Sequence, residues 1–115
     1  MAPLPSRGEI WLADLDPIRG HEQAGTRPVV IISSDMFNHG PARLVFVAPL
    51  TRTDRGVPFH VPIDPPEGGV RARSFILCDM VRSISTDRLS GQPFGVISVA
   101  TLAEVEDRLR VLLEL

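Results

Sequence analysis

Proline and glycine interrupt this chain so often that a long helix is confined to its C-terminal segment, residues 98–115. Eleven prolines and nine glycines fall among the first 97 residues. Between them lie short runs of apolar, often β-branched residues, such as RPVVIIS at 27–33 and RLVFVAPL at 43–50. Because proline fixes φ and lacks an N–H, these runs favour short strands. The pattern predicts a mainly β fold, a small curled β-barrel closed or covered by a C-terminal α-helix.

The same punctuation sets the expected boundaries of the strands. A long loop is predicted at 16–26, one helical turn at 34–39, a polar connection at 51–57 and a turn at 64–70. Strand 58–63 contains two prolines, so we expect it at an edge of the sheet. The predicted strands are 8–15, 27–33, 43–50, 58–63, 72–78, a short one at 80–84 and another at 93–97.

The periodicity changes after residue 97. Leu102, Val105, Leu109 and Leu112 recur at helical spacing, which predicts an amphipathic helix packed on the core. Ser98 is one candidate N-cap, and a capping box formed by Thr101 and Glu104 is the alternative.

The length and the charge of the chain limit the classes of protein to which it can belong. A chain of 115 residues is expected to form one domain over residues 1–115, and no apolar run is long enough to span a membrane. With no signal-peptide core at the N-terminus, we expect a cytoplasmic protein. All twelve basic residues are arginine against fourteen acids, a net charge of −2. This balance argues against a broad basic surface but permits a local basic groove outside the acidic segment 98–115.

Covalent and metal chemistry have few candidates. The single Cys78 excludes an intrachain disulfide and a zinc site of several cysteines. Cys78 follows an apolar run and is interpreted as a small core residue. His39 and His60 are interpreted as structural or surface residues, and no cofactor or metal is expected.

Three polar clusters remain as candidates for function. The segment DPIRGHEQAGTRP at 16–28 places several charged and amide side chains in one glycine-containing loop. A second cluster, 51–55, follows the third strand, and a third contains Asp79, Arg82 and Ser83. From composition alone each cluster is either a functional site or ordinary solvated turn residues.

The order of these motifs resembles the MazF/PemK/Kid family of toxin endoribonucleases. The resemblance rests on RGEIWLADLDP at 7–17, GHEQAGTRPVVIIS at 20–33, VAPLT at 47–51 and CDMVRSIS at 78–85, and it covers nearly the whole chain. It implies an SH3-like barrel of the CcdB/PemK type that forms a homodimer. It also implies the toxin of a type II toxin–antitoxin system, which cleaves single-stranded RNA at selected sequences without a metal. The products would carry 2′,3′-cyclic phosphate and 5′-hydroxyl ends.

The resemblance also implies roles for individual residues. Arg27 and Thr51 match the active-site arginine and threonine, and Glu22 or His21 is the candidate general base. The implied RNA-binding residues are His21, Gln23, Arg55, Phe59, Asp79 and Arg82. Kid-like members carry an arginine two residues before the aspartate that matches Asp79, whereas this chain has Leu77.

Two further implications concern partners and alternatives. The resemblance implies a cognate MazE-like antitoxin whose extended acidic and apolar tail covers the RNA groove. The competing interpretation is a non-catalytic SH3-like binding module, or a gyrase-poisoning toxin of the related CcdB type.

Overall fold

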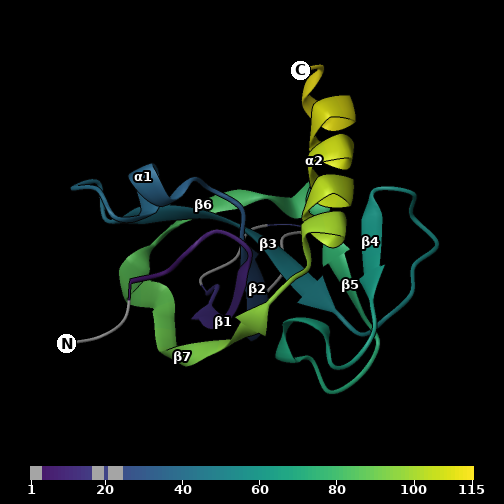
Figure 1. The fold of residues 1–115 in the computed structure, drawn as a ribbon, viewed down its shortest axis with the longest axis horizontal. Coiled ribbons are helices and arrows are strands. Elements are labelled where there is room, and N and C mark those ends of the chain that lie inside the picture. The colour runs from purple at the N-terminus through teal and green to yellow at the C-terminus, as the bar shows by residue number, and fades with distance from the viewer. Residues whose placement is uncertain (1–3, 17–19, 21–24) are drawn as a thin grey trace.

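An antiparallel sheet, curled on itself, forms the centre of the molecule, and a C-terminal helix packs against one of its faces (Figure 1). The computed structural model describes residues 4–16, 20 and 25–115. In this part of the chain the strands are β1 (Glu9–Asp14), β2 (Thr26–Ile31), β3 (Leu44–Thr51), β4 (His60–Ile63), β5 (Ser74–Leu77), β6 (Arg82–Ser85) and β7 (Leu89–Val96). The helices are α1 (Asp35–Asn38) and α2 (Val99–Leu113), with 3-10 turns η1 (Glu67–Gly69), η2 (Cys78–Met80) and η3 (Thr86–Arg88).

Strand β3 joins the two halves of the sheet. The strand order is β4-β5-β3-β2-β1-β7, and β6 also pairs with β3. The first half of β3, Leu44 to Val47, pairs with β6, whereas Leu50 and Thr51 pair with β5. Pro49 falls between these two ladders, where the lack of an N–H is tolerated. The change of partner curls the sheet and carries Thr51 to its far end.

The centre of the sheet, where β2 pairs with the second half of β3, is buried on both faces. Val30 and Ala48 belong to one apolar cluster, which α2 covers through Val105. Their chain neighbours Val29 and Val47 belong to a second cluster, which the curl of the sheet encloses. This double burial explains why the sequence of β2 is continuously apolar rather than alternating.

The predicted mainly β fold with a C-terminal helix is confirmed, and so is the edge position of β4. Ser98 is the N-cap of α2, because its hydroxyl oxygen accepts a hydrogen bond of 3.1 Å from the Thr101 N–H. This settles the choice between the two predicted starts of the helix.

Most predicted strands differ from the structure by one or two residues at an end, as in β2, expected at 27–33 and found at Thr26–Ile31, and β4, expected at 58–63 and found at His60–Ile63. The strand expected at 72–78 spans Ser74–Leu77, and Cys78 opens the turn η2 instead. Strand β7 begins at Leu89 rather than at 93, and its pairing with β1 is interrupted. Ser90 pairs with Leu12 and Gly95 with Ile10, so residues 91–94 stand opposite the single residue Trp11. A polar, glycine-containing start hid this strand from pattern analysis.

Candidate active site

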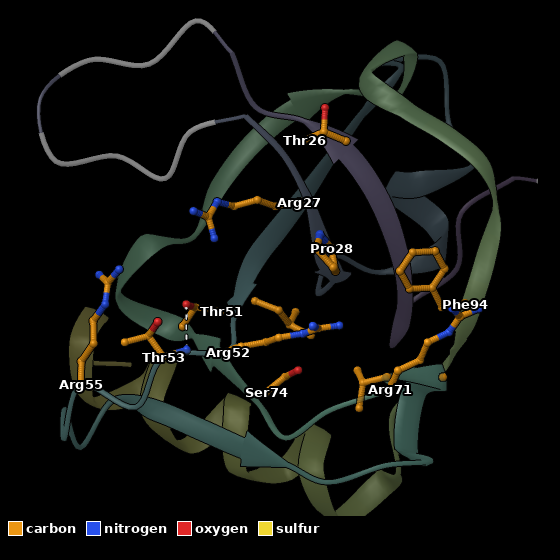
Figure 2. A pocket seen from close by; sticks show the side chains of 13 residues that line it. Thr26, Arg27, Pro28, Thr51, Arg52, Thr53, Arg55, Arg71, Ser74 and Phe94 are labelled. Atoms are coloured by element: carbon orange, nitrogen blue, oxygen red, sulfur yellow. Dashed lines mark hydrogen bonds between the residues drawn. The ribbon is translucent and has the colours of Figure 1, made fainter.

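A cavity of about 920 Å³ opens where β2 begins and β3 ends (Figure 2). Its walls come from the start of β2, the end of β3, the connection that follows β3, the end of η1 with the two residues after it, the first residue of β5 and one residue of β7. The lining residues are Thr26, Arg27, Pro28, Leu50, Thr51, Arg52, Thr53, Arg55, Gly69, Val70, Arg71, Ser74 and Phe94.

Arg27 and Thr51 are brought together by strand register. The antiparallel ladder of β2 and β3 runs from Val29 opposite Pro49 to Ile31 opposite Val47. Arg27 and Thr51 each lie two residues beyond the Val29–Pro49 pair, at the same end of the two strands. Alternation puts both on the sheet face of Val29 and Val47, so they extend a buried apolar row into the cavity. Figure 2 shows the Arg27 side chain directed into the cavity on the side of Thr51.

The Thr51 side chain is held in place and keeps a donor available. Its residue is only 7% exposed. Its Oγ1 accepts a hydrogen bond of 3.2 Å from the Thr53 N–H. Since the acceptor role is occupied, the hydroxyl proton is left to donate, and a phosphate oxygen is a suitable acceptor.

The cavity is strongly positive although the whole chain carries a net charge of −2. Four arginines line it, Arg27, Arg52, Arg55 and Arg71, and no aspartate or glutamate is among the lining residues that the structure describes. Guanidinium groups bind phosphate oxygens in a planar, two-pronged geometry. The cavity therefore suits a phosphodiester chain.

Of the residues implied by the resemblance, Arg27, Thr51 and Arg55 line this cavity, whereas Phe59, Asp79 and Arg82 do not. His21, Glu22 and Gln23 lie outside the described residues.

Arg82 supports the base of the segment that follows β1. It donates to the Leu15 carbonyl at 3.4 Å. Arg88 donates to the Asp14 carbonyl at 3.0 Å, and the Leu15 N–H donates to the Gly25 carbonyl, also at 3.0 Å. These bonds hold Asp14 and Leu15 at the end of β1 against Gly25 and the side chains of Arg82 and Arg88.

Asp79 is paired with a buried histidine. His60 Nε2 lies 3.0 Å from the Asp79 carboxylate, a hydrogen bond in which the ring N–H donates. The His60 side chain is 4% exposed, and its Nδ1 has no hydrogen-bond partner in the described part of the chain. His60 is thus a buried structural residue, as predicted, and it turns Asp79 toward β4.

Cys78 is a core residue, which confirms the prediction. It is 2% exposed and belongs to the cluster that α2 covers. Burial, opposed by Arg108 and aided by Asp79, raises the pKa of its thiol to about 11. The thiol therefore stays protonated at neutral pH, and Cys78 is not a nucleophile.

The sequence prediction included Arg52 only within the candidate cluster 51–55, and it did not select Arg71 or Phe94 as RNA-binding residues. Arg52 sits beside Thr51 and could have been selected by proximity. Arg71 and Phe94 are far from the other motifs in the sequence, and only the folded sheet brings them to the cavity.

The described residues contain neither a metal-binding cluster nor a membrane-spanning helix. In residues 4–16, 20 and 25–115 no group of three His, Cys, Asp or Glu side chains is arranged to hold a metal ion. No helix within these ranges has the length and apolar character needed to cross a membrane.

Comparison with known proteins shows to which family the chain belongs. Residues 6–113 match the model of the PemK-like, MazF-like toxins of type II toxin–antitoxin systems. Endoribonuclease MazF9 of Mycobacterium tuberculosis is 38% identical over 114 residues, which cover 95% of this chain and 96% of that protein. Endoribonuclease PemK of Escherichia coli is also 38% identical, over 93% of this chain and 80% of PemK.

Solved structures agree with the sequence comparison. MazF of Deinococcus radiodurans superposes with a TM-score of 0.88 at 28% identity, covering 99% of this chain and 100% of MazF. A MazE–MazF structure from the same organism (Form-II) gives a TM-score of 0.82 at 28% identity and covers 99% of both chains. The chain therefore belongs to the PemK-like, MazF-like toxins of type II toxin–antitoxin systems.

Proposed function

We propose that this toxin is a sequence-selective endoribonuclease that cleaves single-stranded RNA without a metal and leaves 2′,3′-cyclic phosphate and 5′-hydroxyl ends. The observation that carries the proposal is that Arg27 and Thr51 line the same cavity together with three further arginines. Its support is the 38% identity to proteins named endoribonucleases over most of their length.

The chemistry suits these residues because RNA supplies its own nucleophile. The 2′-oxygen attacks the adjacent phosphorus, the bond from phosphorus to the 5′-oxygen breaks, and the 5′-oxygen takes up a proton. The protein must align the strand and stabilise the negative charge that develops on the phosphorane. Arg27 would bind the non-bridging oxygens, and the Thr51 hydroxyl would donate to one of them.

Proton transfer from the 2′-hydroxyl needs a base. The Kid-type arginine is replaced by Leu77, which is fully buried in β5 and cannot contact RNA. We propose His21 or Glu22 as the base. An imidazole is better matched to neutral pH than an unperturbed carboxylate.

The partners follow from the same family membership. MazE–MazF structures are among the relatives of this fold. We propose that a MazE-like antitoxin lays an extended acidic and apolar tail over the arginine-lined cavity, and that two toxin chains form a homodimer. The acidic groups of the tail would pair with the arginines, while apolar anchors would contribute most of the affinity.

The test is incubation of the purified protein with a long single-stranded RNA in excess EDTA. Discrete fragments whose 3′ ends carry a cyclic phosphate, identified by mass spectrometry, are expected. The folded Arg27→Ala variant is the control for a contaminating nuclease. RNA that stays intact, together with inhibition of DNA gyrase, would contradict the proposal and point to the gyrase-poisoning class.

A further inference from the structure

The wall on the opposite side of the cavity from Arg27 carries an exposed aromatic ring. Phe94 lines the cavity with 46% of its surface exposed, and Arg71 lines the same wall (Figure 2). Phe94 is the only large exposed apolar residue among the lining side chains that the structure describes. It belongs to neither apolar core cluster. Packing inside the protein therefore does not account for this ring.

The backbone of β7 presents Phe94 to the cavity. It is the last residue of the excursion 91–94, which leaves the ladder with β1 opposite Trp11. Irregular pairing of this kind re-aims a side chain that a regular strand would direct elsewhere.

Gly69 and Gly95 allow η1, which precedes Arg71, to pack closely against β7. A Cβ on Gly69 would lie 2.2 Å from the Phe94 carbonyl oxygen, and one on Gly95 would lie 2.7 Å from the Gly68 carbonyl carbon. The backbones of η1 and β7 are therefore in direct contact, and Arg71 follows Gly69 by two residues.

Polar contacts anchor the same segment on both sides. The Glu67 carboxylate accepts a hydrogen bond of 3.0 Å from the Ser98 N–H. Arg73 donates to both carboxylate oxygens of Asp64 at 2.8 Å. The backbone segments that bear Arg71 and Phe94 are thus held against each other and against the start of α2 before any ligand binds, which lowers the entropic cost of binding.

From this arrangement we infer that Phe94 is a stacking platform for one RNA base beside the scissile phosphate, and that Arg71 binds a phosphate on that side. The inference rests on the proposed ribonuclease function and adds a specificity-determining pair to it. Bases of single-stranded RNA have free faces that stack on aromatic rings, and a guanidinium at the same wall neutralises the backbone. The pair contributes to RNA binding and not to the chemical step.

The test compares Phe94→Leu, which keeps an apolar side chain but removes the ring, with Phe94→Trp, which restores a ring. On an RNA oligonucleotide whose cleavage site is mapped with the unmodified protein, Phe94→Leu should raise KM by about 5- to 150-fold. The kcat value should change little, and Phe94→Trp should recover most of the loss. Phe46→Leu is the matched control, because Phe46 is 44% exposed but does not line the cavity.

Abasic nucleotides identify the stacked base. Each base near the cut is removed in turn, and kcat/KM is measured for the unmodified protein and for Phe94→Leu. One position should cost the unmodified protein as much as Phe94→Leu does, with no further loss when the two changes are combined. Equal costs in both proteins at every position, or a KM unchanged in Phe94→Leu, would overturn the stacking role while RNA cleavage itself stands. If the unmodified protein leaves all RNA intact, the proposed function fails and this inference with it.

The phosphate contact of Arg71 has its own readout. Arg71→Gln should make the plot of log KM against log salt concentration shallower by about 0.7, the value for one phosphate contact on a single strand. Arg110→Gln on the exposed side of α2, where Arg110 pairs with Asp107, is the control. An unchanged salt slope in Arg71→Gln would remove Arg71 from the RNA-binding surface.

Discussion

Arg27 lies where a buried row of residues becomes a binding surface. In β2 the side chains of Ile31 and Val29 are fully buried, and Arg27 continues their row at the cavity. The strand that bears the guanidinium is therefore held by the core on both of its faces. Such a support is what a catalytic side chain needs to keep its geometry.

Substitutions at Arg27 should distinguish the contribution of its positive charge from that of its planar guanidinium group. Arg27→Ala is expected to lower kcat of RNA cleavage by about two to three orders of magnitude, the scale for loss of one preorganised donor. Arg27→Lys should recover little of this, because an ammonium does not reproduce the planar fork. Initial rates on one RNA oligonucleotide check both, with circular dichroism as the control for folding. Near-normal cleavage by Arg27→Ala would exclude it from the site.

Cys78 offers an unusually clean titration. The chain has neither lysine nor tyrosine, so apart from the N-terminal amine, Cys78 is the only group expected to titrate between pH 8 and 12. Its thiol pKa is about 11 in the folded protein against a reference of 9.0. The folded state holds the proton more tightly, so this contribution to stability is complete below pH 9 and is lost as the pH rises through about 11.

The expected decrease in unfolding free energy is roughly 3 kcal/mol. Urea unfolding at a series of pH values measures it. In Cys78→Ala the decrease should be absent, and an identical decrease in that variant would assign it to another group.

At the scale of elements, η1 and β7 pack backbone to backbone in the cavity wall, so a side chain added at their junction would collide with main-chain atoms. Gly69 and Gly91 both have positive φ, 78° and 73°, but a Cβ on Gly91 would meet no atom within 4 Å. Gly91→Ala should therefore cost only the backbone strain, about 1–2 kcal/mol. Gly69→Ala should cost a further 1–3 kcal/mol, because its Cβ would collide with backbone. Denaturant midpoints compare the two, and equal losses would mean that the junction is not tightly packed.

The features of the fold that depend on local sequence could be predicted, whereas those that depend on contacts between distant segments could not. The approximate positions of most strands, and Ser98 as one of two candidate helix starts, were predictable because proline, glycine and apolar periodicity act locally. The motifs that resemble the toxin family singled out Arg27 and Thr51, which the structure places in the lining of one cavity. Phe94 was not, because its exposure depends on an excursion of β7 and on glycine contacts between segments about 25 residues apart in the chain. The pairing of Asp79 with His60 depends likewise on the register of β4 with β5, which brings His60 opposite Leu77.

For the whole molecule, antitoxin and RNA should compete for one surface. The charge that suits a phosphodiester chain equally suits carboxylates, since four arginines and no acid are among the described residues that line the cavity. A saturating cognate antitoxin tail should abolish RNA cleavage and displace RNA in fluorescence anisotropy. Simultaneous binding of both, with cleavage unchanged, would contradict the proposed mode of inhibition.

The proposed homodimer can be checked separately. Sedimentation at micromolar concentration should give about twice the 12.6 kDa mass of the chain. A fully active monomer would show that one chain alone forms the RNA groove.

The arginine-lined wall has a kinetic consequence. In the part of the chain that the structure describes, the lining residues are Arg, Thr, Ser, Pro, Gly, Leu, Val and Phe, with no His, Asp or Glu among them. None of these side chains is suited to accept the 2′-hydroxyl proton near neutral pH, so a bend in a plot of log kcat against pH would belong to a group beyond them that moves the proton. A bend near pH 6.5 would identify a histidine, one near 4.3 a glutamate, and a straight line of unit slope would mean that hydroxide from the solvent does the work.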